Sequence, residues 1–239
     1  MERESIEYDV VVVGGGPSGL ASACKLKQLN PELSVCLLEK GSEIGSHIIS
    51  GAVFEPQTLF DLFPEDAKNC PTLKTSVVKD DLYWLANNNK SIKVPSWLMP
   101  KSLHNKGNYI ISLGELCQWI AERAMDLGVD IFPGFPAQQY LTDTNGRVTG
   151  IATGDMGIDK DGNQKGTYAP GMDILAKQTI FAEGARGHLG KKLIKEFGLD
   201  EGKTPQHFAI GFKEIWEVDN DKHSPGNVLH TMGWPLKGG

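Results

Sequence analysis

The sequence predicts an α/β fold in which a parallel sheet carries a β-meander and is followed by part of a second, β-rich domain. The apolar run YDVVVVGG (8–15) lacks alternation, as is typical of a strand buried on both faces of a parallel sheet. Helical spacing follows it, and SVCLLEK (34–40) returns to strand, which completes one βαβ unit. Later, Asn145-Gly146 and Asp161-Gly162 mark the turns of two hairpins. We expect these hairpins to form a meander laid over the main sheet.

The first helix is predicted over 17–29, because Leu20, Ala23, Cys24 and Leu26 recur at helical intervals. Residues 41–107 have no clear periodicity and contain five prolines, so we expect loops, short helices and an insertion there rather than more sheet. The stretch SLGELCQWIAERAMDLG (112–128) predicts the strongest helix in the chain, and VDIFPG (129–134) predicts the next strand.

The last third of the chain predicts one more unit of strand and helix. AKQTIFAEGARG (176–187) indicates a third buried strand that ends in a glycine turn. HLGKKLIKEFG (188–198) indicates an amphipathic helix closed by Gly198. HFAIGFKEIWEV (207–218) predicts the first long strand of a second layer.

Composition narrows the possible partners and compartments. The 239 residues suffice for one large domain or for one domain with a smaller companion. A formal net charge of -6 gives no general electrostatic reason to expect nucleic acid. The four cysteines form no C-x-x-C pair and are interpreted as reduced, buried thiols in a reducing compartment. No secretory or transit peptide and no apolar stretch of spanning length is recognised, so any membrane contact is expected from one side.

A Gly-x-Gly-x-x-Gly motif follows the first strand, which favours a bound dinucleotide. Gly14 permits the tight turn, Gly16 lets the backbone approach a pyrophosphate, and Gly19 lets the helix pack closely on the sheet. Pro17 suits the first helical turn, whose free N–H groups face the phosphates. Glu39 ends the second strand 20 residues after Gly19, where it can accept hydrogen bonds from ribose hydroxyls and would repel a 2'-phosphate. This argues against NADP.

A second glycine element decides between FAD and NAD. TIFAEGARG (179–187) returns Gly184 to the same edge of the sheet after a helix and a meander. A simple NAD domain continues as βαβαβ and has no such meander. On its own this element could be only a strand end. Together with the first motif, it favours FAD held along its whole length.

At this point the chain resembles the N-terminal part of the electron transfer flavoprotein-ubiquinone oxidoreductase family, within the wider group of two-domain flavoproteins that includes geranylgeranyl reductases and aromatic hydroxylases. The most particular of the matching segments are GSHIISGAVFEP (45–56) and GIATGDMGIDKDG (150–162). The resemblance implies FAD, a [4Fe-4S] cluster, oxidation of reduced electron transfer flavoprotein and reduction of ubiquinone at a membrane surface. The implied fold is an FAD-binding Rossmann-like domain with a β-meander plus part of a β-rich quinone domain.

The resemblance also implies the cofactor-binding residues. The pyrophosphate loop comprises Gly14, Gly15, Gly16, Pro17, Ser18 and Gly19, and the ribose end comprises Glu39 and Lys40. The segment close to the flavin is Ser50, Gly51 and Ala52, and the second flavin contact is Glu183 with Gly184. Read without the family, the segment around Gly51 could also be a packed core loop. No catalytic side chain is expected, because the flavin carries the chemistry. No metal ligand is expected either, because the cluster's cysteines lie in a C-terminal segment that this chain lacks.

These inferences lead to an explicit hypothesis. Residues 1–75 and 107–200 are expected to form the FAD-binding domain, and 76–106 with 201–239 part of the quinone-binding domain; the iron-sulfur domain is absent, as in a fragment or a shortened gene. The expected function is electron transfer from reduced electron transfer flavoprotein to ubiquinone. The alternatives are a reductase or monooxygenase fed by NAD(P)H and an inactive flavin-binding fragment.

A peripheral position on the inner membrane is implied, facing the cytoplasm in a bacterium or the matrix in a mitochondrion. Apolar residues crowd into 45–66, which is the preferred membrane-contacting segment, and KVPSWLMPKSL (93–103) adds Trp97 and Met99 between lysines. The competing interpretation is that these side chains face the core.

Overall fold

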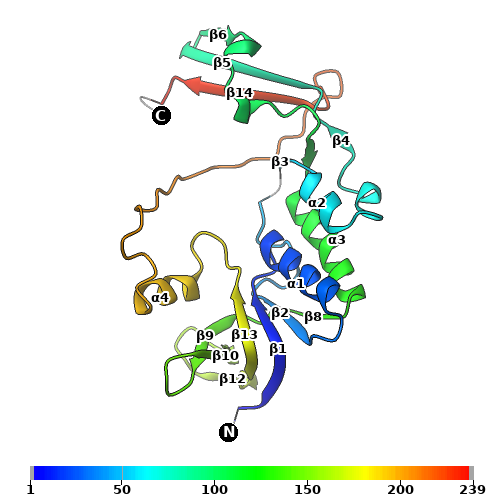
Figure 1. The fold of residues 1–239 in the computed structure, drawn as a ribbon. Coiled ribbons are helices and arrows are strands. Elements are labelled where there is room, and N and C mark those ends of the chain that lie inside the picture. Colours follow the sequence, from blue (N-terminus) through cyan, green and yellow to red (C-terminus); the bar gives the residue numbers. More distant parts are fainter. Residues whose placement is uncertain (1–2, 50, 237–239) are drawn as a thin grey trace. The chain divides into compact units, whose positions relative to one another are not determined.

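The computed structural model describes residues 3–49 and 51–236, and the chain divides into two compact units, Met1–Ile48 with Cys117–Gly211 and Ile49–Leu116 with Phe212–Gly239 (Figure 1). The predicted α/β class is confirmed. The segments 49–75 and 107–116 were expected in the first domain but lie in the second unit, and 201–211 was expected in the second domain but lies in the first unit. The function of each unit stays a proposal.

A six-stranded sheet in the order β8-β2-β1-β13-β10-β9 forms the centre of the first unit. Parallel pairs join β1 to β2, β1 to β13 and β2 to β8, whereas β10 pairs antiparallel with both β13 and β9. β1 is central because its valines pack on both faces, and Val11 and Val12 are fully buried. The strands are β1 (Ser5–Val13), β2 (Val35–Glu39), β8 (Val129–Pro133), β9 (Ala137–Thr142), β10 (Val148–Thr153) and β13 (Asp173–Phe181), with a separate ribbon of β11 (Met156–Ile158) and β12 (Gln164–Ala169).

Three longer helices accompany this sheet at the predicted places: α1 (Pro17–Leu29), α3 (Leu113–Asp126) and α4 (His188–Glu196). α1 buries Leu20, Ala23 and Cys24, three of the residues whose spacing predicted it. One core cluster joins both kinds of element and includes Val11, Val13, Cys36, Leu38, Ile151, Ile174 and Leu189. Leu189 comes from α4, so burial of this side chain fixes α4 to the sheet.

Two expectations for the first unit are wrong. The β9-β10 hairpin of the expected meander does not lie over the main sheet, because β10 pairs edge to edge with β13 and so extends the sheet; the β11-β12 hairpin forms a separate ribbon. β13 is not buried throughout either: Ile174 is buried, but Lys177 and Gln178 are exposed. The reason is that the sheet is covered unevenly, so a strand needs an apolar core position only where another element packs on it.

The second unit contains two three-stranded sheets, β14-β5-β6 and β3-β7-β4. The expectation of no further sheet in 41–107 is therefore wrong. Polar strands explain the error: β6 has the sequence KSIKV and its first four residues are exposed, so it shows no apolar alternation. The elements are β3 (Ala52–Phe54), α2 (Gln57–Leu62), β4 (Thr75–Ser76), β5 (Lys79–Asn87), β6 (Lys90–Val94), β7 (Tyr109–Ile111) and β14 (Asn227–Gly233), with single 3-10 turns at Ala67–Asn69, Ser96–Leu98 and Lys101–Leu103.

The strand expected over 207–218 is absent from the described structure. The segment is extended between the last helix and the last strand (Figure 1), and its apolar side chains reach solvent. Phe212 is 92% exposed and Ile210 is 89% exposed. Alternating apolar residues favour a strand only when a neighbouring strand supplies hydrogen bonds, and none of the described strands pairs with this segment.

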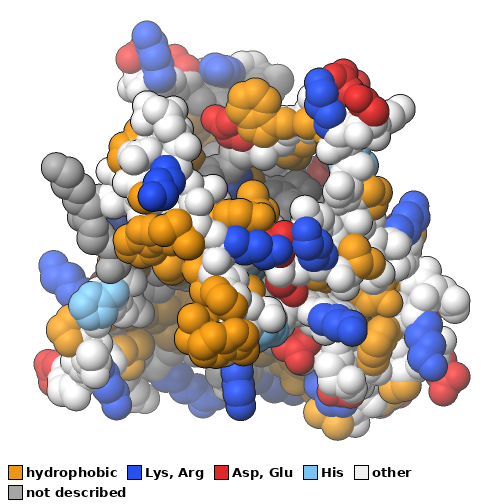
Figure 2. Space-filling view, turned by 90° about the horizontal axis from the view of Figure 1, so that it is seen from above, with side chains coloured by type: hydrophobic (Ala, Val, Ile, Leu, Met, Phe, Trp, Pro, Cys, Tyr) orange, Lys and Arg blue, Asp and Glu red, His pale blue; other side chains and the backbone are white. Residues whose placement is uncertain are grey.

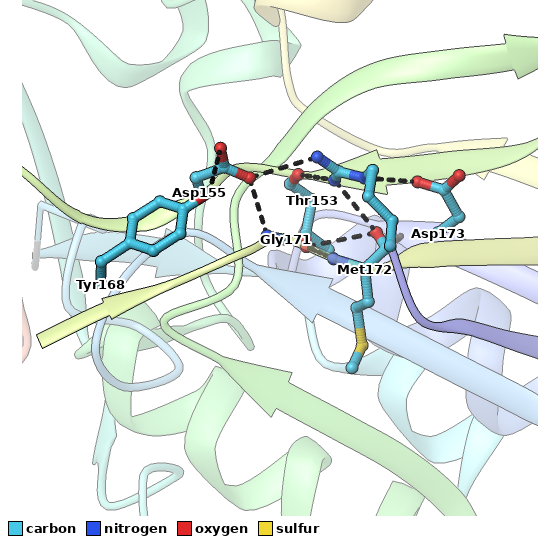
Figure 3. A network of polar contacts seen from close by, with 7 residues as sticks. Thr153, Asp155, Tyr168, Gly171, Met172 and Asp173 are labelled. Carbon is cyan, nitrogen blue, oxygen red and sulfur yellow. Dashed lines mark hydrogen bonds and ion pairs between the residues drawn. The ribbon is translucent and has the colours of Figure 1, made fainter. Parts of the chain in front are cut away.

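Arg3, just before β1, forms ion pairs with Asp173 at the start of β13 and with Asp155 after β10. Figure 3 shows Asp155 and Asp173 with Thr153 and Gly171 near them. Arg3 Nε donates to the Asp173 carboxylate at 2.9 Å, and its Nη1 lies 3.2 Å from the Asp155 carboxylate. The Gly171 N–H donates to Asp155 at 2.8 Å, which is the main reason that the pKa of Asp155 lies below its ordinary value. This network keeps the ends of β10 and β13 in register beside the chain's first strand.

Asp9 makes the stability of the first unit pH-dependent. Its carboxylate accepts hydrogen bonds from Lys177 Nζ at 2.6 Å and from the Ser34 N–H at 2.9 Å, and the lysine contact is the main cause that lowers its pKa from 3.8 to about 2. A depressed carboxyl pKa contributes stability above the unfolded value, and this contribution is lost as the pH falls through the folded value. We expect the urea midpoint of the wild type to fall between pH 4 and 2, and to fall less steeply in Asp9→Asn. Parallel pH profiles would contradict the assignment.

Candidate functional site

The glycine loop leaves the centre of the first unit's sheet, where β1 ends. Val13 is level with Leu38 of β2 on one side and with Phe181 of β13 on the other. Gly14 follows with a φ of +111°, and a Cβ at this position would lie 2.5 Å from the Ala182 carbonyl oxygen. A Cβ at Gly19 would lie 2.0 Å from the carbonyl oxygen of Gly14. The two outer glycines of the motif are therefore required by packing alone.

Gly16 differs from them because open space surrounds it. Apart from Gly16 itself and its two chain neighbours, no heavy atom lies within 4 Å of the position that its Cβ would take, and its backbone is ordinary extended chain with a φ of -82°. It caps α1, with Pro17 as the first helical residue, and the first helical hydrogen bond runs from the Leu20 N–H to the Gly16 carbonyl. The N–H groups of Ser18 and Gly19 precede that bond and so have no acceptor within the helix. An opening beside a helix N-terminus fits a phosphate group.

Glu39 ends β2 next to this loop, and its side chain is only 13% exposed. Its carboxylate accepts hydrogen bonds from the Gly15 N–H at 2.9 Å and from the Gly41 N–H at 2.7 Å. Each carboxylate oxygen can accept more than one hydrogen bond, so capacity for a ribose hydroxyl remains. Lys40, beside it, is exposed. Sequence reasoning missed the part that Glu39 plays in shaping the loop through Gly15.

Glu183 has a structural part as well. It follows β13, is 11% exposed, and accepts the Gly190 N–H at 2.8 Å and the Leu189 N–H at 3.3 Å. These are N–H groups of the first turn of α4, so the carboxylate caps that helix. Gly184, the next residue, has a φ of +78° and open space around it. At this position the open backbone, rather than the acidic side chain, suits contact with a ligand.

The predicted flavin segment belongs to the second unit, apart from Ser50, which lies outside the described residues. Gly51 is exposed with open space around it, and its carbonyl accepts a hydrogen bond from Lys213 Nζ at 3.1 Å. Ala52 begins β3 and pairs with Ile111 of β7. Ile49 is 61% exposed, so the segment is not a packed core loop.

All four cysteines are buried free thiols. Burial raises the pKa of Cys24 and Cys36 to about 12, and burial together with the charge of Glu39 raises that of Cys117 to about 11. In the described parts of the chain, no three His, Cys, Asp or Glu side chains gather as they would around a metal ion.

Apolar side chains reach the surface of the second unit in places. Trp97 is 80% exposed, whereas Met99 of the same segment is buried. In the other candidate segment, 45–66, Ile49 and Val53 are exposed but Leu59 and Phe63 are buried. Figure 2 shows such hydrophobic side chains on one face, with Lys and Arg side chains among them. Across residues 3–49 and 51–236, every helix is too short or too polar to cross a bilayer.

Two family descriptions match parts of the chain. Residues 12–65 match "NAD(P)-binding Rossmann-like domain", and residues 208–239 match "ETF-QO, ubiquinone-binding". The first covers the glycine loop, α1 and Glu39, and so agrees with the site geometry. The second covers the exposed extended segment and β14.

Among curated relatives, the chain is 56% identical to the electron transfer flavoprotein-ubiquinone oxidoreductase of Pseudomonas aeruginosa, over 99% of this chain and 44% of that protein. The chain is a relative of electron transfer flavoprotein-ubiquinone oxidoreductases. It is 47% identical to the mitochondrial one of rice and 44% identical to the human one, covering 41% and 39% of those proteins. The resemblance found in the sequence is confirmed, and the chain spans less than half the length of these oxidoreductases.

Solved structures confirm the predicted Rossmann-like α/β fold. A geranylgeranyl bacteriochlorophyll reductase-like protein from Thermoplasma acidophilum matches with a TM-score of 0.58 and 21% identity, over 96% of this chain and 51% of that one. A myxobacterial FAD-dependent halogenase matches with a TM-score of 0.53 and 16% identity, over 77% of this chain and 39% of that one. At such identities the likeness concerns the fold alone.

Proposed function

We propose that this chain is the nucleotide-binding part of an FAD-dependent oxidoreductase that passes electrons from reduced electron transfer flavoprotein to ubiquinone. The observation that carries the proposal is the 56% identity over 99% of the chain to an oxidoreductase of that name. The match of residues 208–239 to a ubiquinone-binding family supports the acceptor.

FAD is favoured over NAD(P) by two features of the first unit. Glu39 is fixed at the ribose end, and its charge opposes a 2'-phosphate. The sheet also continues through β13 into the antiparallel strands β10 and β9, where a simple NAD domain would add βα units. The matched description names NAD(P), but it covers only 12–65, which is the motif common to both classes of nucleotide.

The residues of the site have distinct parts in this proposal. The N–H groups of Ser18 and Gly19 bind the pyrophosphate above the open position at Gly16, and Glu39 binds the ribose, with Lys40 exposed beside it. Backbone at Gly184 forms a further contact. The family resemblance also assigns Ser50, Gly51 and Ala52 to the flavin, of which Ser50 lies outside the described residues. Bound FAD supplies the redox chemistry, accepting and donating electrons. The protein binds and orients it, and no side chain is needed as an acid or base.

The remaining partners follow from the same resemblance. We propose peripheral attachment to the inner membrane, facing the cytoplasm or the matrix, through exposed apolar side chains of 45–66, such as Ile49 and Val53. The highly exposed Trp97 is a second point of contact. A [4Fe-4S] cluster would need a close set of cysteine ligands, and the four buried, separated cysteines here do not form one.

Reduction kinetics test the proposal. The purified chain, supplied with FAD and repurified, is expected to show a flavin absorbance spectrum. In a stopped flow, reduced electron transfer flavoprotein is expected to bleach that spectrum, and NADH or NADPH is not. Bleaching by NAD(P)H alone would indicate a reductase or hydroxylase. A flavin that neither donor reduces would indicate an inactive binding fragment, and a colourless product would contradict FAD binding.

A further inference from the structure

Two histidines contact the two carboxylates that flank the glycine loop. His47 Nδ1 lies 3.8 Å from Glu39 Oε1, and His188 Nδ1 lies 3.3 Å from Glu183 Oε1. The two pairs are built alike: each carboxylate is nearly buried and accepts two backbone N–H groups, and each imidazole is about half exposed, at 59% and 54%.

Strand register brings both carboxylates to the same edge of the sheet. Val13 is level with Leu38 and with Phe181, so Glu39, the last residue of β2, and Glu183, two residues after β13, lie just beyond that level. Glu39 accepts a hydrogen bond from the Gly15 N–H. A Cβ added at Gly14 would lie 3.4 Å from the backbone nitrogen of Glu183. Two negative side chains thus stand on either side of the loop that is to receive a doubly charged pyrophosphate.

We propose that His47 and His188 are electrostatic residues of the dinucleotide site, which offset the charge of these carboxylates beside the pyrophosphate. The inference rests on the proposed binding of FAD. Neither residue belongs to the glycine motif, and neither was among the site residues expected from the sequence. Their part is electrostatic, since the carboxylates keep their backbone hydrogen bonds in either state of the imidazoles.

Other charged groups near the two imidazoles contribute to the local electrostatic potential. Lys40 and Glu43 lie in the same loop as His47. The buried Cys117 thiol of α3 is near enough to Glu39 for that charge to raise its pKa. Arg186 precedes His188, and its guanidinium lies over the Phe208 ring at 5.0 Å. Lys192 is one turn further along α4, so it lies on the same face as His188.

The sign of the effect follows from linkage. A bound dianion favours a positively charged imidazole over a neutral one. Binding of FAD is then coupled to proton uptake, so the affinity rises as the pH falls. Half-exposed ion pairs contribute at most about 1 kcal/mol each, which corresponds to about threefold to fivefold in affinity per histidine.

Titration of the FAD-free chain with FAD, followed by flavin fluorescence, tests the proposal between pH 8.5 and 6. The wild type is expected to bind FAD about tenfold more tightly at pH 6 than at pH 8.5. His47→Gln and His188→Gln are each expected to bind about threefold more tightly at the lower pH, and the double variant is expected to bind equally at both pH values. His47→Lys, a permanent cation, restores tight binding at pH 8.5. His104→Gln is the matched control, because this imidazole contacts only the Met99 carbonyl of the second unit among its described contacts.

Calorimetry in two buffers of different ionisation enthalpy adds a readout that does not depend on redox activity, namely proton uptake on binding. Uptake in the wild type and none in the double variant is expected. A double variant whose affinity follows pH as the wild type does would overturn the inference while leaving FAD binding intact. Absence of FAD binding at every pH in the wild type would instead overturn the proposed function.

Discussion

Gly16→Ala is expected to weaken FAD binding by about 30-fold, or about 2 kcal/mol, while the melting temperature of the FAD-free protein stays within about 1 °C of the wild type. Beyond its two chain neighbours the added methyl group meets no protein atom within 4 Å, and the φ of -82° is open to alanine, so folding is not affected. It does occupy the space through which a phosphate approaches the first turn of α1. Fluorescence titration with FAD and a thermal melt measure the two effects.

Gly166→Ala serves as the control for this variant. Gly166 lies in β12, also has open space around it and is remote from the glycine loop in sequence. We expect unchanged FAD affinity. If Gly16→Ala and Gly166→Ala bind FAD with equal affinity, the phosphate does not bind beside Gly16.

Gly19→Ala is expected to destabilise the fold itself, by about 3 kcal/mol. A methyl group 2.0 Å from the Gly14 carbonyl oxygen cannot be accommodated unless α1 moves away from the end of β1. Because that movement also displaces the N–H groups at the start of α1, FAD affinity is expected to fall together with stability. Urea unfolding of the FAD-free protein and FAD titration below the unfolding transition measure both losses.

Gly190→Ala is the matched comparison, since Gly190 also lies near the start of a helix. Its Cβ would lie 3.6 Å from Glu183 Oε2, which is ordinary van der Waals contact. Alanine is the better helix former, so this variant is expected to gain up to about 1 kcal/mol. A Gly19→Ala protein as stable as Gly190→Ala would show that close packing at the loop is not limiting.

The first βαβ unit could be predicted closely from sequence because local signals agree there with the tertiary structure. The helix predicted over 17–29 begins at Pro17 and ends at Leu29, and the strand before it is apolar on both faces. The glycine spacing also predicted correctly where backbones approach, at Gly14 and Gly19. Periodicity, capping and packing all indicate the same structure in this region.

Elsewhere the decisive interactions are distant or leave no pattern. β5 was missed because one of its partners, β14, lies more than 130 residues away in the sequence. β6 pairs with β5 and was missed because its own side chains are largely polar and exposed. The strand expected over 207–218 failed for the converse reason, since its apolar alternation has no partner among the described strands. Glu183 was assigned to the ligand, but its carboxylate is used by α4, a contact that sequence spacing alone does not distinguish from ligand binding.

The register of β1 has a consequence for how the protein is made. Its hydrogen bonds on one side go to β2, which follows soon after, but those on the other side go to Asp173–Phe181. At ordinary rates of translation the ribosome needs about 10 to 30 s to synthesise the intervening chain. During that interval β1, an apolar strand, has left the ribosome but keeps one edge unpaired. We therefore expect the nascent chain to bind chaperones.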